Sequence, residues 1–166
     1  MTESNPTPAK TWRRMTTDRR LRAARAFWEA DQAPEDHAQA ALLIAQQRKF
    51  RPKFVLGLAP ESKAKHMAGI AALPDALAAR ALVAYHLAEQ REMMGAFLDE
   101  LGLKHEDGVI EEEDVRPDAA RIAPAVSAIA GRFPAEDVSL YLTTLFCQDP
   151  ETWAELGKVP QVQQTE

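Results

Sequence analysis

Prolines divide the chain into short segments, and seven of them precede runs of residues with helical spacing. They are Pro34, Pro52, Pro60, Pro74, Pro117, Pro134 and Pro150. Proline is common at the first position of an α-helix, because its missing N–H would have no partner there in any case. Alanine is abundant and β-branched residues are scarce, which favours helix over strand. The pattern predicts an all-α, single-domain irregular helical bundle of about seven to nine helices with short connections.

The chain of 166 residues is long enough to bury one hydrophobic core. We expect a disordered N-terminal tail over 1–10, a single helical domain over 11–158 and a C-terminal tail over 159–166. The first helix is expected to begin near Thr17. Pro124 lies inside a helical pattern and is expected to kink or split that helix.

Three sequence features constrain the cellular compartment: the cysteine content, the apolar stretches and the N-terminus. A single cysteine, Cys147, excludes an internal disulfide and a thiolate zinc site. The longest apolar stretch, 76–88, is interrupted by Arg80 and His86 and is too short to cross a bilayer. The N-terminus lacks the apolar segment of a secretory signal. We therefore expect a cytoplasmic protein with no membrane contact.

An acidic stretch at 103–114, LKHEDGVIEEED, resembles the second half of a calcium loop. With Gly108 at position six of such a loop, Asp114 falls at position twelve. Leu103 and His105 then occupy the first two ligand positions, where calcium requires oxygen. We expect no calcium site but a turn at the Asp-Gly step, with a short extended bridge around it.

Metal and catalytic motifs are missing from the sequence. His86 and Glu89 could face one side of a helix, but the chain has no Glu-x-x-His or His-Glu-x-x-His. It also has no Gly-x-Ser-x-Gly, and Cys147 lies near a predicted helix end, where the dipole does not favour a thiolate. The sequence favours a non-catalytic protein with no metal and no cofactor. An enzyme whose site assembles only in three dimensions is kept as a second alternative.

The net charge of −5 hides an asymmetry along the chain. Residues 1–66 carry 13 Lys and Arg against 7 Asp and Glu, whereas residues 67–166 carry 7 against 18. Such a division can signal a face for nucleic acid or for a membrane, but it also arises when two halves of a fold neutralise each other.

Two basic segments, 10–28 and 48–54, also contain tryptophan and phenylalanine. Arginine and lysine beside aromatic rings suit phosphate contacts and base stacking. The candidate partner-binding residues are Arg13, Arg19, Arg22, Arg25, Arg48, Lys49, Arg51 and Lys53. A second candidate surface is an exposed apolar patch formed by Trp12, Trp153, Met93 and Met94, with ordinary core packing of these residues as the alternative.

The function favoured by these observations is protein–protein interaction or self-association. Binding of nucleic acid through the basic N-terminal half is the alternative, because the charge is present without a specific nucleic-acid motif. The identity of the partner is not encoded in any motif of the sequence.

Overall fold

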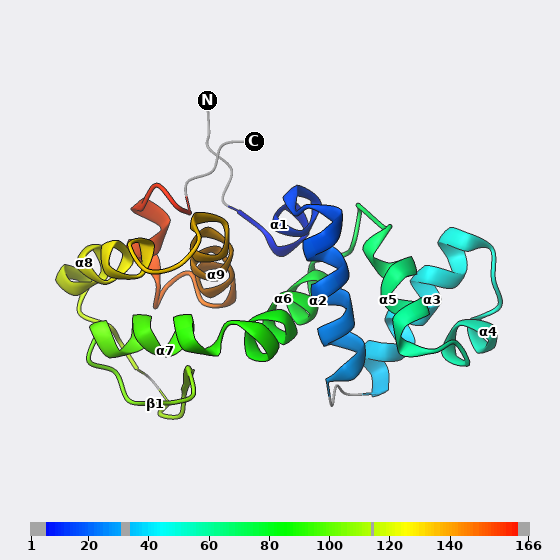
Figure 1. Ribbon diagram of the computed structural model, residues 1–166, viewed down its shortest axis with the longest axis horizontal. Coiled ribbons are helices and arrows are strands. Elements are labelled where there is room, and N and C mark those ends of the chain that lie inside the picture. Colours follow the sequence, from blue (N-terminus) through cyan, green and yellow to red (C-terminus); the bar gives the residue numbers. More distant parts are fainter. Residues whose placement is uncertain (1–5, 31–33, 114, 163–166) are drawn as a thin grey trace. The chain divides into compact units, whose positions relative to one another are not determined.

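The computed structural model describes residues 6–30, 34–113 and 115–162. Within these ranges it contains nine α-helices, one short 3-10 helix and one two-stranded hairpin (Figure 1). The expected all-α fold is therefore confirmed. None of the helices in the described ranges combines the length and the apolar character that crossing a membrane requires.

The chain divides into two compact units. The N-terminal unit is Pro8–Ala88, and the C-terminal unit holds Glu89–Glu166 together with the described residues Pro6 and Thr7. That 11–158 folds as one domain stays a prediction.

Six helices form the N-terminal unit. They are α1 (Pro8–Arg14), α2 (Thr17–Glu29), α3 (Pro34–Arg48), α4 (Pro52–Leu56), α5 (Pro60–Ala68) and α6 (Asp75–Glu89), the last residue of α6 being counted with the other unit. Prolines open α3, α4 and α5, and Pro74 directly precedes α6, as the sequence predicts. The Thr16 hydroxyl caps α2 by accepting the backbone N–H of Arg19 at 3.2 Å.

Helices α2 and α5 lie side by side and make the closest packing of the N-terminal unit (Figure 1). Alanines face each other in this contact, with Ala23 and Ala24 buried on α2 and Ala64 and Ala68 buried on α5. Small side chains let two helices approach closely, so the large core residues, such as Phe27, pack around the contact.

Trp12 corrects the expected N-terminal tail. Residues 8–10 were expected to be disordered, but they form the first turn of α1. Trp12 is fully buried, and its indole N–H donates to the Ile70 carbonyl oxygen at 2.7 Å. Burial of this ring with a satisfied donor fixes the short helix, which helical periodicity alone does not reveal. At the other end, Val159 and Val162 are buried rather than part of a free tail.

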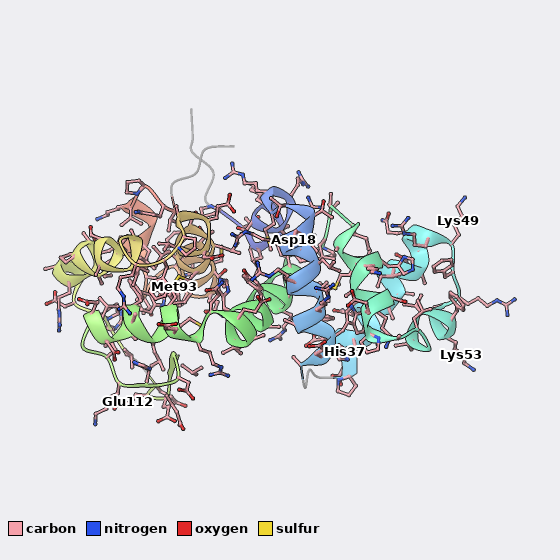
Figure 2. The ribbon with its side chains drawn as sticks, in the orientation of Figure 1. Asp18, His37, Lys49, Lys53, Met93 and Glu112 are labelled. Atoms are coloured by element: carbon pink, nitrogen blue, oxygen red, sulfur yellow. The ribbon has the colours of Figure 1, made fainter. Side chains whose placement is uncertain are left out.

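The expected apolar surface patch is wrong. Trp12, Trp153, Met93 and Met94 are each at most 8% exposed, so all four belong to the core. Figure 2 shows Met93 directed among the helices of the C-terminal unit. Large apolar side chains at helical spacing are usually core residues, and here they are.

The C-terminal unit contains three helices, the hairpin and the 3-10 helix. Its elements are α7 (Arg91–Glu100), β1 (His105–Glu106), β2 (Val109–Ile110), α8 (Ala119–Ala130), α9 (Ala135–Gln148) and η1 (Ala154–Lys158). Helix α8 packs against α7 and continues through Pro124, so the helix is not split, and the alternative, a kink at Pro124, stays a prediction. Proline removes only one backbone hydrogen bond here, and the buried Ile122, Val126 and Ile129 hold both sides of it in one helix.

The acidic stretch folds as a tight β-hairpin. Strands β1 and β2 pair antiparallel with Glu106 opposite Val109. The two residues between them, Asp107 and Gly108, have φ of 50° and 88°, and positive φ at both positions is what a type I′ hairpin turn requires. A Cβ on Gly108 would lie 2.6 Å from the Met94 Cβ, so the turn approaches α7 more closely than any other residue permits. The predicted turn and extended bridge are confirmed.

Candidate partner-binding surface

The division of charge follows the division into units. The N-terminal unit carries 14 Lys and Arg against 7 Asp and Glu, a net charge of +7. The rest of the chain carries 6 against 18, a net charge of −12. Each unit therefore has a strong excess of charge of one sign. A charged side chain is available to a partner only if it is not already paired within its own unit.

Arg25 is used inside the N-terminal unit. Its guanidinium donates two hydrogen bonds to the Glu61 carboxylate, both at 2.7 Å, and so links α2 to α5. The side-chain hydrogen bond with Arg25 is the main reason that the pKa of Glu61 is lowered from its ordinary value. This paired geometry neutralises Arg25 within its own unit.

Arg19 and Arg22 both contact Tyr85 of α6. The Arg19 guanidinium donates to the Tyr85 hydroxyl at 3.4 Å, and that of Arg22 lies 5.6 Å from the centre of the Tyr85 ring. Both arginines are half-buried, so they join α2 to α6. Arg13 is exposed on α1, and its carbonyl oxygen accepts from Arg20 at 3.1 Å. The structure therefore gives Arg19, Arg22 and Arg25 contacts within the N-terminal unit.

The other four candidate residues lie together between the end of α3 and the start of α4. Arg48, Lys49, Arg51 and Lys53 are all exposed. Across the described part of the chain, none of these four side chains has a hydrogen bond or an ion pair. Figure 2 shows Lys49 and Lys53 extending away from the helices of their unit. These cations remain available to a partner.

Two phenylalanines stand among these cations. The rings of Phe50 and Phe54 meet edge to face with their centres 5.0 Å apart, and Phe50 also contacts the His66 ring at 5.5 Å. Phe54 is 55% exposed, although phenylalanine is usually buried. Leu56, the last residue of α4, is also exposed.

The exposed apolar side chains of the described residues concentrate on the same two helices. The large ones are Leu42, Phe54, Leu56 and Val109, and the first three belong to α3 and α4. A local concentration of exposed apolar groups is typical of an interaction site. The basic–aromatic surface is defined by Arg48, Lys49, Phe50, Arg51, Lys53 and Phe54.

Lys49 adopts a backbone conformation that favours glycine. It has φ of 60° directly after α3, and the N–H of the next residue, Phe50, donates to the Ala45 carbonyl oxygen at 2.9 Å. This is the hydrogen bond of a helix-ending motif in which glycine is the usual residue. A lysine in the left-handed region costs about 1 kcal/mol, because its Cβ crowds the backbone. The chain thus keeps a cation at a position where glycine would be more stable.

A groove in the C-terminal unit has the opposite charge. It has a volume of about 420 Å³ and is lined by Ile110, Glu112, Val115, Arg116, Asp149, Glu151, Thr152 and Trp153. Asp149 is tied to Thr152, whose hydroxyl and N–H donate to its carboxylate at 2.6 Å and 3.2 Å, and these bonds lower the pKa of Asp149. Glu112 and Glu151 are exposed at the groove.

The carboxylates of the hairpin add to this acidic surface. A hydrogen bond with Glu106 raises the pKa of Glu111, so the two carboxyl groups lie close enough to share a proton. Both side chains are exposed.

The histidines considered for metal binding have structural contacts. His86 is buried, with Nδ1 2.7 Å from the Leu82 carbonyl oxygen. His105 holds the hairpin on α7, because Nε2 lies 2.7 Å from Asp99 Oδ1 and Nδ1 accepts the Gly108 N–H at 3.0 Å. Within the described ranges, no three His, Cys, Asp or Glu side chains are grouped so that they could hold a metal ion.

Asp114, which was weighed as the last calcium ligand, lies outside the described residues. The position of His105, turned toward Asp99 and the backbone of the hairpin, gives this stretch the role of a structural turn.

Sequence reasoning identified the cations of the basic–aromatic surface but not the exposure of Phe54. Adjacency to Val55 gives no signal, because neighbouring helical residues such as Met93 and Met94 can both be buried. Val55 takes the buried position and Phe54 is left outside. The groove could not be foreseen, because its residues are separated by more than 30 positions along the chain.

Comparison with protein-family models, with curated protein sequences and with solved structures found no match to this chain.

Proposed function

We propose that this chain is a binding protein that docks an acidic segment of a protein partner on its basic–aromatic surface. The observation that carries the proposal is that Arg48, Lys49, Arg51 and Lys53 are exposed without an acidic partner in the described chain while they surround an exposed Phe54. A cytoplasmic location, as expected from the sequence, is part of the proposal.

The arrangement suits a protein interface on energetic grounds. Exposed ion pairs contribute little affinity, but cations around a contact raise the association rate and select an acidic partner. The affinity comes from an aromatic anchor that loses its contact with water on binding. Phe54 can act as that anchor, since more than half of its surface is exposed and Phe50 supports it from one edge.

The backbone of Lys49 supports the same proposal. A strained residue in a turn persists when its side chain is needed there, and glycine would relieve the strain. Replacement of Lys49 by glycine would remove one of the four cations, so stability and binding are opposed at this position.

Single-stranded nucleic acid is the second candidate partner. The observation in its favour is that Arg51 and Lys53 flank an exposed aromatic ring, an arrangement on which a base can stack while its phosphates pair with the cations. A protein partner is placed first because only one ring is largely exposed, whereas nucleic-acid platforms stack several successive bases.

The test measures fluorescence anisotropy of labelled poly-glutamate and of a labelled single-stranded oligonucleotide with the full chain. Lys49→Glu/Lys53→Glu reverses two cations of the surface. Lys10→Glu/Arg14→Glu is the matched control, because it makes the same change of charge on exposed residues of α1 in the same unit.

Wild type and the α1 control should bind poly-glutamate alike, and Lys49→Glu/Lys53→Glu should bind it roughly tenfold more weakly. Binding should fall as salt screens the contact. Equal loss in both variants would reduce the effect to net charge and overturn the proposal. Tighter binding of the oligonucleotide than of poly-glutamate, with the same dependence on Lys49 and Lys53, would replace the protein partner by nucleic acid.

A further inference from the structure

We infer that the acidic segment docked by the basic–aromatic surface belongs to a second copy of this chain and is the groove of its C-terminal unit. The inference rests on the proposed function and names the partner. It follows from two surfaces of one chain that are complementary in charge.

The basic–aromatic surface has cations around an apolar centre. Phe54 is 55% exposed, and the next exposed apolar residue, Leu56, follows on the same short helix. Lys49 and Lys53 extend outward from this region (Figure 2). A complementary surface needs carboxylates around an apolar recess.

The groove of the C-terminal unit supplies the carboxylates, from Glu112, Asp149 and Glu151. Its surface is mostly polar, and the half-buried Ile110 and Val115 give it a smaller apolar part. Arg116 is the one cation of the lining, and it acts on Asp149, whose pKa it helps to lower.

The charges of the two units favour this partner over an unrelated one. The N-terminal unit carries +7 and the remainder of the chain −12, so every copy supplies both members of the contact at equal concentration. Between two such chains the electrostatic attraction is specific to opposite units, because contacts between like units are repulsive.

Such a contact joins two different surfaces and is therefore heterologous. Each copy in a pair keeps one unused surface of each kind, so association continues beyond the dimer unless a ring closes. The assembly should accordingly grow with protein concentration and dissolve with added salt.

The experiment is sedimentation velocity of the full chain at low salt over a range of concentrations. Arg48→Glu/Lys49→Glu/Arg51→Glu/Lys53→Glu turns the four cations of the basic–aromatic surface into carboxylates, and Glu112→Lys/Glu151→Lys turns the net charge of the groove lining from −2 to +2. Each variant alone presents two surfaces of like charge. An equimolar mixture restores both complementary pairs, the native surface with the native groove and the reversed surface with the reversed groove. Circular dichroism of each variant confirms that it is folded.

Wild type should self-associate, each variant alone should be monomeric, and the mixture should associate again. Association of the wild type that survives in either variant would overturn the inference, as would a mixture that stays monomeric. A monomeric wild type that still binds poly-glutamate through Lys49 and Lys53 would overturn the second copy as partner and leave the proposed function intact. A monomeric wild type that binds no poly-glutamate would overturn both.

Discussion

The two units of the molecule use their charged side chains in different ways. In the C-terminal unit, carboxylates fix local structure: Asp118 caps α8 by accepting the Ala120 N–H at 3.0 Å, Asp149 holds Thr152, and Asp99 holds His105. In the N-terminal unit, arginines join helices to each other. Four of its cations, Arg48, Lys49, Arg51 and Lys53, are exposed without a hydrogen bond or an ion pair in the described ranges, and these four follow one another between α3 and α4.

Excess charged side chains form a binding surface only where the fold leaves them exposed. The sequence shows a basic half, but Arg25 contributes to helix packing while Lys49 contributes nothing to it. What separates the two is the presence of an acid on the neighbouring helix, which only the tertiary structure decides.

The largest expected effect comes from Trp12→Ala in the N-terminal unit. Loss of a fully buried ring should lower the free energy of unfolding by about 3–5 kcal/mol. Hydrogen exchange measures the consequence for each unit. If 11–158 is one folding domain, the slow amides of α2 and of α7 should lose protection equally. Loss confined to Pro8–Ala88 would contradict the single domain and show that the two units unfold separately.

Gly108→Ala should cost about 2–4 kcal/mol in the C-terminal unit, since a Cβ would meet the Met94 Cβ at 2.6 Å in a backbone with φ of 88°. Urea denaturation of this variant measures the loss. Gly57→Ala in the N-terminal unit is the matched control, because its Cβ would meet nothing closer than 3.5 Å. Equal stability of the two variants would show that the hairpin does not pack on α7 as described.

Lys49→Gly should separate stability from binding. Relief of the left-handed backbone should raise the free energy of unfolding by about 1 kcal/mol, while loss of one cation weakens binding of poly-glutamate. Denaturation and fluorescence anisotropy on the same preparation test both parts. A variant that gains stability and keeps full affinity would remove Lys49 from the basic–aromatic surface.

The smallest effect is expected at alkaline pH. Burial raises the pKa of Tyr141 well above its ordinary value, so this hydroxyl stays protonated in the folded chain when it already ionises in the unfolded chain. Unfolding then releases a proton, and the contribution of Tyr141 to stability is lost as pH rises above about 10. Tyr141→Phe should lose less stability than wild type between neutral and alkaline pH in thermal unfolding. An identical dependence on pH in both proteins would show that Tyr141 is not buried.

Much of the fold could be predicted because its signals are local. Proline at the first helical position marks α3, α4 and α5, and an Asp-Gly step marks the hairpin. Trp12 was misplaced because its burial depends on the Ile70 carbonyl oxygen, 58 residues away. The continuity of α8 through Pro124 likewise depends on tertiary packing, which compensates for the missing hydrogen bond.

The candidate surface was predictable only in part for the same reason. Basic residues can be counted in a sequence, but Arg19, Arg22 and Arg25 find partners on helices that are distant in the chain. Arg51 and Lys53 have no such partner among the described residues. The eight candidates are alike as basic residues of one half of the sequence, and only the tertiary structure shows which of them have contacts within the fold.

The central claim is that the basic–aromatic surface is where this chain meets its partner, and amide chemical shifts test it most directly. Isotope-labelled wild type at low concentration is mixed with an excess of unlabelled poly-glutamate, the acidic ligand that the proposed function requires it to bind. We expect salt-sensitive changes of amide chemical shift that are confined to residues 48–56 of the labelled chain. Unchanged shifts there, or shifts centred on α1 and α2, would contradict it.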